Sequence, residues 1–178
     1  MSAAGEAGAG GGTAGTAPAR QIAVIGAGGA EPGSEVWALA EAVGRGLGEA
    51  GVVLVTGGRG GVMEAASRGA VAAGGETIGI LPGYDLGEAN PYCSRVIATG
   101  VGHARNLAVV GSGEVVIAVG GEWGTLSEIG LARAIGRTVV ALRSWTLDGR
   151  ERMEGAPGIE PAETPEDAVA AALAALPA

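Results

Sequence analysis

Short apolar runs alternate with helical patterns along most of this chain, and this alternation restricts the possible folds more than any other feature of the sequence. The runs are rich in Val and Ile, as expected of strands that are buried on both faces of a parallel sheet. We therefore predict an α/β fold, a single Rossmann-like, doubly wound parallel sheet flanked by helices. The predicted strands are Gln21–Ile25, Val52–Val55, Glu76–Ile80, Ser94–Ala98, Glu114–Val119 and Thr138–Leu142.

Capping residues and the spacing of apolar residues predict helices between these strands. Ser34 is expected to cap the first helix and Thr164 the last, with Pro165 at the first helical position. In such a fold, ligands bind beyond the carboxyl ends of the strands, where the strand order reverses. The expected helices span residues 34–50, 62–73 and 102–111, a stretch that opens within 119–130 and ends near 136, and residues 164–176.

The chain has 178 residues, a length that suits one domain, and 47% of them are hydrophobic, enough for a substantial core. Residues 1–19 are almost all Gly, Ala, Ser and Thr, and they bury too little side chain to offset the entropy of ordering. We expect residues 1–19 to be a flexible tail and residues 20–178 to form the folded domain.

Charge and composition argue against several classes of protein. The net charge of −8 disfavours a broad nucleic-acid surface, because phosphate backbones require positive charge. Lysine is absent, which removes Schiff-base catalysis and the lysine of an ATP-binding P-loop. The sequence has one cysteine, Cys93, and one histidine, His103. One chain therefore cannot build a disulfide, a cysteine metal site or a multi-histidine metal site. No stretch predicts a membrane span or a signal peptide, so a cytoplasmic location is expected.

Glycine clusters follow three of the predicted strands and would meet at one edge of a parallel sheet. Glycine lets backbone N–H groups approach a ligand closely, and a helix N-terminus offers unpaired donors to a phosphate. Each cluster alone is more typical of a tight turn, but together they predict that the domain binds a nucleotide-like ligand. Their spacing departs from the dinucleotide fingerprint, which disfavours NAD. The clusters contain Gly26 and Gly28; Gly57, Gly58, Arg59 and Gly60; and Gly120, Gly121 and Gly124.

Thr125 and Glu128 have the T-x-x-E spacing of a capping box, in which the two side chains tie down the start of a helix. The same spacing would hold the Glu128 carboxylate rigidly over the ligand edge, so a structural role and a catalytic role are compatible. Arg105 opens a predicted helix, where its charge opposes the helix dipole. This placement indicates either an anionic ligand or a nearby carboxylate, and Arg59 invites the same argument.

Two stretches together resemble the LOG (Lonely Guy) family, formerly called lysine-decarboxylase-like. They are LVTGGRGGVMEAASRGAVAAGGETIGILPG and GHARNLAVVGSGEVVIAVGGEWGTLSEIGLARAIGRTVVAL. Within the family the chain is most similar to a bacterial branch that also resembles molybdenum cofactor carrier proteins. The resemblance covers about residues 20–145, and Gly121, Gly124, Thr125 and Glu128 match the family signature P-G-G-x-G-T-x-x-E.

The resemblance implies a nucleoside 5′-monophosphate phosphoribohydrolase, which breaks the N-glycosidic bond and releases a base and ribose 5-phosphate. Arg105 and Glu128 would be the catalytic pair, and Gly121, Gly124 and Thr125 would cradle the phosphate of an AMP-like substrate. Neither a metal nor a cofactor is required for this reaction. The family also implies a homodimer or homotetramer, and the Ala- and Gly-rich helices over residues 62–73 and 126–135 would permit close packing between subunits.

Two positions depart from the signature. Gly120 stands in place of the proline, and Glu122 stands in place of a glycine that would face phosphate. A carboxylate there repels phosphate unless Arg105 or Arg59 compensates or the side chain points away; it could instead bind ribose hydroxyls or a base N–H. The alternative function is therefore a non-catalytic binding or carrier protein for a nucleotide or for a pterin-type molybdenum cofactor.

Overall fold

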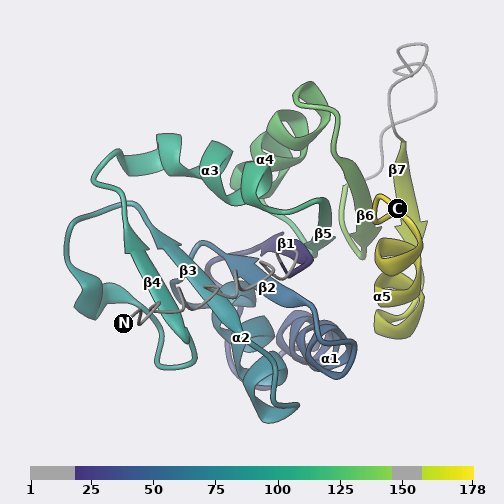
Figure 1. Ribbon diagram of the computed structural model, residues 1–178, viewed down its shortest axis with the longest axis horizontal. Helices are drawn as coiled ribbons and strands as arrows, with labels where there is room; N and C mark the ends of the chain where they lie inside the picture. The colour runs from purple at the N-terminus through teal and green to yellow at the C-terminus, as the bar shows by residue number, and fades with distance from the viewer. Residues whose placement is uncertain (1–18, 146–157) are drawn as a thin grey trace, which may run out of the picture.

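One parallel sheet forms the centre of the molecule in the computed structural model, which describes residues 19–145 and 158–178 (Figure 1). The tail predicted over residues 1–19 lies outside the described residues, except for its last residue. Every paired strand runs parallel to its neighbours, which confirms the predicted fold class. The strands are β1 Gln21–Gly26, β2 Val53–Thr56, β3 Thr77–Leu81, β4 Arg95–Ala98, β5 Val115–Val119, β6 Thr138–Leu142 and β7 Ile159–Ala162.

Helices connect most of these strands at the expected places. The α-helices are α1 Glu35–Glu49, α2 Val62–Ala72, α3 Arg105–Ser112, α4 Trp123–Ala134 and α5 Pro165–Ala174, and the short 3-10 helices are η1 Leu86–Glu88 and η2 Gly102–Ala104. Ser34 caps α1 and Thr164 caps α5, as predicted, because each side chain accepts a hydrogen bond from a backbone amide of the first turn. The single helix predicted over residues 102–111 is divided between η2 and α3.

The strand order is β4-β3-β2-β1-β5-β6-β7. The first strand, β1, lies in the middle of the sheet; β2, β3 and β4 follow it toward one edge, and β5, β6 and β7 follow it toward the other. Strand β1 lies between β2 and β5, and Ile22 is opposite both Leu54 and Val115. The strand order therefore reverses between β1 and β5, and the carboxyl ends of these strands are where folds of this kind bind ligands.

Alternate strand residues face two layers of helices, which Figure 1 shows on opposite sides of the sheet. Val24 and Ile117 belong to the core that α1, α2 and α5 cover, whereas Ile25 and Val116 belong to the core beneath α3 and α4. Burial on both faces explains why the strand sequences are almost continuously apolar.

Helices α1 and α2 pack very closely, because glycines let their backbones meet. A Cβ on Gly44 would overlap the carbonyl oxygen of Ala66, and a Cβ on Gly69 would overlap that of Glu41. The small residues of α2 are thus explained by packing within one chain, whereas the sequence analysis had connected them with packing between subunits. The homodimer or homotetramer stays a prediction.

Strand β7 was missed by the sequence analysis. Among the described strands it pairs with β6 alone, from Ile159 opposite Val139 to Ala162 opposite Leu142. Pro161 cannot donate a backbone hydrogen bond, so it is tolerated only because β7 is an edge strand. Four residues that include a proline and an exposed Glu160 lack the apolar pattern by which the other strands were predicted.

Candidate functional site

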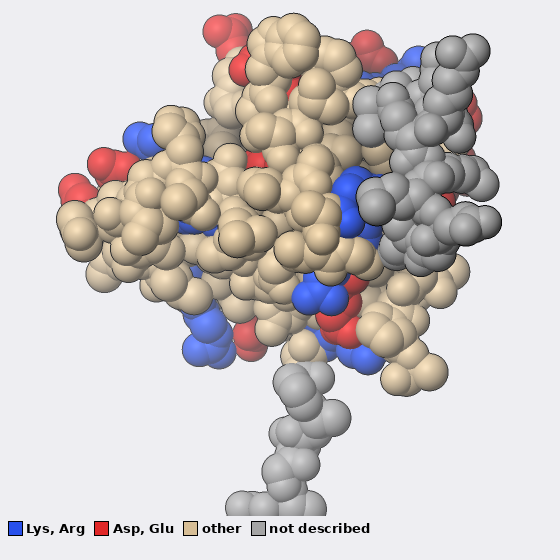
Figure 2. All heavy atoms as spheres, turned by 90° about the horizontal axis from the view of Figure 1, so that it is seen from above, with Lys and Arg blue, Asp and Glu red and all other residues tan. Residues whose placement is uncertain are grey.

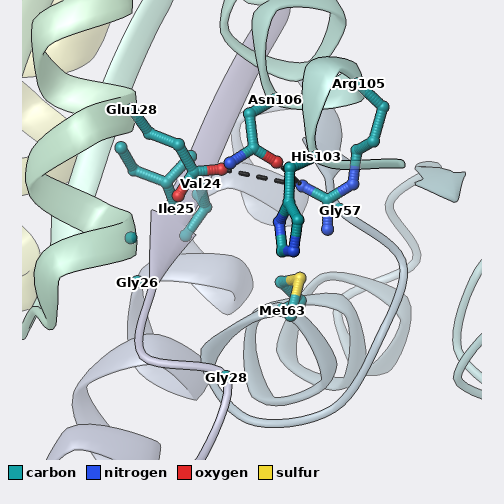
Figure 3. A pocket seen from close by; sticks show the side chains of 11 residues that line it. Val24, Ile25, Gly26, Gly28, Gly57, Met63, His103, Arg105, Asn106 and Glu128 are labelled. Carbon is teal, nitrogen blue, oxygen red and sulfur yellow. Dashed lines mark hydrogen bonds and ion pairs between the residues drawn. The ribbon is translucent and has the colours of Figure 1, made fainter. Parts of the chain in front are cut away.

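A cavity of about 200 Å³ lies at the reversal of the strand order, between the turns that follow β1 and β2 and the first turns of α2, α3 and α4. The predicted site residues that line it are Gly26, Gly28, Gly57, Arg105, Gly124 and Glu128. Its other lining residues are Val24, Ile25, Met63, His103 and Asn106. Figure 3 shows the polar ends of Arg105, Asn106 and Glu128 close together, with the His103 ring and Met63 below them.

The absence of a side chain at Gly57 makes room for the Arg105 guanidinium. A Cβ on Gly57 would lie 2.6 Å from Arg105 Nη2 and 2.7 Å from Met63 Sδ, which is closer than packed atoms approach one another. The φ angle of Gly57 is not positive, so the turn after β2 does not itself require glycine at this position. Gly57 is therefore explained by the placement of Arg105.

Arg105 and Glu128 form an ion pair at the wall of the cavity. Arg105 Nη1 lies 3.7 Å from Glu128 Oε1, and each side chain is only 10% exposed. Arg105 Nη1 also donates a hydrogen bond to Asn106 Oδ1, whereas the buried Arg105 Nε has no hydrogen-bond partner among the described residues. A buried guanidinium with donors to spare is suited to an anion, because charge-assisted hydrogen bonds to phosphate or carboxylate are strong.

Burial dominates the electrostatics of this pair. It raises the pKa of the Glu128 carboxyl to about 7, and the positive charge of Arg105 offsets only part of that effect. Burial also lowers the pKa of Arg105, the Glu128 carboxylate raises it, and the charge of Arg59 lowers it. The carboxyl of Glu128 can therefore exchange a proton near neutral pH, which is a property of groups that act as acids or bases.

Helices α2 and α4 both begin at the cavity without a side-chain cap. The N-cap residue of α2, Gly61, has no side chain, and the side chain of Glu122, the N-cap residue of α4, accepts no hydrogen bond from the first turn. Among the described α-helices, α1 and α5 have side-chain caps, and both begin outside this cavity. The Val62 amide at the start of α2 donates to the carbonyl oxygen of Ala27, so the donors left for an anionic ligand include the amides of Met63 and Gly124, two residues that line the cavity wall.

The predicted capping box of Thr125 and Glu128 is wrong. Helix α4 already begins at Trp123, so both residues lie inside it, and both are buried. The left-handed backbone of Gly120, with a φ angle of 61°, lets the chain turn into the helix earlier than the T-x-x-E spacing indicated. Glu128 thus faces the cavity and does not stabilise the helix end.

Several predicted residues do not line the cavity, namely Gly58, Arg59, Gly60, Gly120, Gly121, Glu122 and Thr125. Two of them are held in the turn after β2 by contacts within the protein. Arg59 Nη2 lies 3.2 Å from Glu88 Oε2, and the carbonyl oxygens of Gly58 and Arg59 accept hydrogen bonds from Asn90. Asn90 thus fixes the turn that places Gly57, and a direct role of Arg59 in binding a ligand stays a prediction.

The turn after β5 is held by Trp145. Its Nε1 donates a hydrogen bond to the carbonyl oxygen of Glu122 at 3.2 Å, and a Cβ on Gly121 would lie 2.8 Å from its ring. Trp145 also packs against Trp123, with ring centroids 5.3 Å apart. The Glu122 carboxylate does not enter the cavity of Arg105 but lies over Gly29 in a neighbouring cavity, which removes the expected repulsion of a phosphate.

Sequence reasoning missed some of the lining residues. Met63 reads as an ordinary core residue at a helix start, and nothing in its spacing distinguishes it. His103 was excluded from a multi-histidine metal site and was not assigned to the ligand site, although it lies two residues before Arg105, and Asn106 follows Arg105 directly. The indication available in the sequence was that His103 and Asn106 both lie next to or near Arg105, which opens α3.

The described residues also limit other kinds of site. Residues 19–145 and 158–178 contain no group of three or more His, Cys, Asp or Glu side chains placed to hold a metal ion. Within the same ranges, no helix has both the length and the apolarity needed to cross a bilayer. On the face shown in Figure 2, the acidic and basic side chains drawn in colour are interspersed and do not form one basic surface.

The fold and this cavity define a Rossmann-like protein with a cavity at the switch point of its parallel sheet, the place where folds of this kind bind small ligands. The sequence model of the SLOG cluster4 family matches residues 19–169, so the chain belongs to this family. This result confirms the resemblance to LOG-like proteins.

The chain is also similar to three proteins over most of its length. An uncharacterised protein of Archaeoglobus fulgidus is 43% identical over 150 residues, which cover 84% of this chain and 91% of that protein. The molybdenum cofactor binding protein of Rippkaea orientalis is 36% identical, with a TM-score of 0.79, over 89% of this chain and 98% of that one. The molybdenum cofactor carrier protein of Chlamydomonas reinhardtii is 33% identical, with a TM-score of 0.76, over 88% of this chain and 98% of that one.

Proposed function

We propose that this protein binds a phosphate-bearing, pterin-type molybdenum cofactor as a carrier or storage protein. The observation that carries the proposal is the similarity, over nearly their full length, to proteins that bind or carry this cofactor in two organisms. The cavity supports the proposal, because it offers an arginine and two uncapped helix N-termini to an anion at the ligand edge of the sheet. In this function Arg105 and Glu128 bind the ligand without transforming it.

The proposed contacts follow from the charge of each part of the site. The phosphate lies against the amides of the first turns of α2 and α4, where Met63 and Gly124 border the cavity, and Arg105 donates to its oxygens. Neutral Glu128 can donate its proton to a phosphate oxygen, and its pKa of about 7 makes this form available near neutral pH. The molybdenum travels as part of the ligand, so no dedicated metal site is required.

A second candidate function is hydrolysis of the N-glycosidic bond of a nucleoside 5′-monophosphate, and the Arg105–Glu128 pair favours it. In that reaction the bond between C1′ and the base breaks, a water oxygen bonds to C1′, and a water proton ends on the base. The Glu128 carboxylate would stabilise the positive ribose or take the proton from water, and Arg105 would hold the phosphate.

One preparation separates the two functions. The protein is expressed in cells that make the molybdenum cofactor, and native mass spectrometry and elemental analysis measure the bound ligand and molybdenum. A carrier retains about one molybdenum and one pterin per site, and Arg105→Ala loses both.

The same preparation is incubated with AMP, GMP, CMP and UMP, and free base is measured by chromatography. Release of a base that Glu128→Gln abolishes supports the hydrolase; absence of both ligand and release contradicts both functions.

The carrier is further proposed to act in the cytoplasm as a homodimer or homotetramer. The exposed apolar side chains Leu107 and Ile135, on α3 and just after α4, are consistent with a partner on that side of the molecule. Light scattering during gel filtration measures the mass of the assembly, and a monomer at all concentrations contradicts this part of the proposal.

A further inference from the structure

A second cavity of about 320 Å³ adjoins the first at the turn after β1. The two cavities share this turn, because Gly26 and Gly28 line the first and Ala27 and Gly29 line the second. They also share the start of α4, where Glu122 lines the second cavity and Gly124 lines the first. A ligand laid across this turn would border both cavities, and their volumes together fall in the usual size range of small-molecule sites, roughly 300–1,000 Å³.

The two cavities differ in the charges that line them. The first holds the Arg105 guanidinium together with the Glu128 carboxyl that pairs with it, whereas the charged residues that line the second are the carboxylates of Glu31 and Glu122. A phosphate therefore fits the first cavity, which has an arginine, better than the second, which has two carboxylates and no Lys or Arg among its lining residues. This difference favours a ligand whose anionic end enters the first cavity and whose other end carries hydrogen-bond donors into the second.

Glu122 is placed to select such donors. Its backbone is fixed by the hydrogen bond from Trp145 Nε1 to its carbonyl oxygen, and its Oε1 lies 3.8 Å from where a Cβ on Gly29 would be. The carboxylate therefore reaches across to the turn after β1. Among the ion pairs of the described residues, none involves Glu122.

We propose that the second cavity recognises the 2-amino-4-oxopyrimidine edge that guanine and pterins share, with the Glu122 carboxylate accepting two hydrogen bonds from it. This inference rests on the proposed function and adds to it the chemical class of the heterocycle. An ionised carboxylate only accepts hydrogen bonds, and its two oxygens match the ring N–H and the exocyclic amino group that lie side by side on this edge. Adenine presents an unprotonated ring nitrogen at the same place, which a carboxylate repels.

The test uses three nucleotides that carry the same ribose and phosphate. Isothermal titration measures the binding of GMP, IMP and AMP, with inorganic phosphate as a fourth ligand, to the wild type and to Glu122→Gln. Glu35→Gln is the matched control, because it removes one exposed carboxylate from the first turn of α1, outside both cavities. IMP lacks only the 2-amino group of GMP, so it separates recognition of the base from recognition of the ribose.

The wild type is expected to bind GMP at least about tenfold more tightly than IMP or AMP, because a lost hydrogen bond to a charged group has this order of effect. Glu122→Gln should weaken GMP binding by about 10- to 100-fold and leave AMP binding nearly unchanged, whereas Glu35→Gln should keep the preference for GMP. Equal binding of the three nucleotides, altered equally by Glu122→Gln, overturns the inference and leaves the phosphate site intact. Binding of none of the four ligands overturns the proposed function as well.

Discussion

Arg105 Nη1 lies 3.7 Å from Glu128 Oε1, and both side chains are almost completely buried at the wall of a cavity. An ion pair that only stabilised the fold would gain little here, because the cost of desolvating two charges is comparable to their attraction. Burial raises the pKa of Glu128 despite the nearby positive charge of Arg105, as expected where desolvation of a carboxylate outweighs its pairing. We therefore interpret the pair as part of a ligand site.

Glu128 should make the stability of the protein depend on pH. Burial raises the pKa of its carboxyl from 4.5 to about 7, so between these pH values the folded protein holds a proton that the unfolded chain has released. The free energy of unfolding should then fall as pH rises through this window, by up to about 3 kcal/mol from this group. Urea denaturation between pH 4.5 and 8 should show a smaller decrease for Glu128→Gln than for the wild type. Identical slopes for the two proteins would contradict the raised pKa.

Arg105→Ala should weaken binding of a phosphate-bearing ligand by at least about tenfold, because it removes a charge-assisted hydrogen bond from a buried site. Isothermal titration with GMP measures this change. Arg68→Ala is the matched control, since Arg68 pairs with Glu41 on the surface and does not line the cavity. Equal binding by the wild type and both variants would show that the phosphate does not contact Arg105.

Gly57→Ala should displace the Arg105 guanidinium and weaken ligand binding, because its Cβ would lie 2.6 Å from Arg105 Nη2. We expect a loss of stability of about 1–3 kcal/mol from the forced repacking. Gly130→Ala in α4 is the control: a Cβ there meets nothing within 4 Å, and stability should increase by roughly 0.5–1 kcal/mol. The idea that Gly57 makes room for Arg105 fails if Gly57→Ala behaves like Gly130→Ala in both measurements.

Gly124→Ala should separate binding from folding. A Cβ on Gly124 meets no atom within 4 Å, so the fold should tolerate it. The same Cβ would occupy space beside the amides at the start of α4, where we place the phosphate, and binding should fall by about tenfold. Circular dichroism and GMP titration measure the two properties. Unchanged affinity in a well-folded variant would move the phosphate away from α4.

Most of the fold follows from the sequence, because buried parallel strands leave a clear apolar pattern and capping residues mark helix starts. Ser34 and Thr164 cap their helices as predicted, and the runs from Gln21 and Thr138 are strands. Strand β7 could not be predicted, because Pro161 argues against a strand unless its position at the edge of the sheet is already known.

The candidate site was predictable only in part. Arg105 was identified because a positive charge opposes the dipole at a helix start, and the structure places it beside Glu128. The T-x-x-E spacing was misleading, because a spacing of three residues is the same at the start of a helix and inside it. Two features of the site depend on contacts between distant parts of the chain and so could be found only from the fold. The Glu122 carboxylate lies in a second cavity, and Asn90 of a distant loop holds the turn after β2.

The most direct test of the central claim is a crystal structure of the protein soaked with GMP. We predict phosphate density between the first turns of α2 and α4, with an oxygen within hydrogen-bonding distance of Arg105, and the guanine beside Glu122. A nucleotide bound elsewhere, with the cavity between Arg105 and Glu128 left empty, would contradict the account.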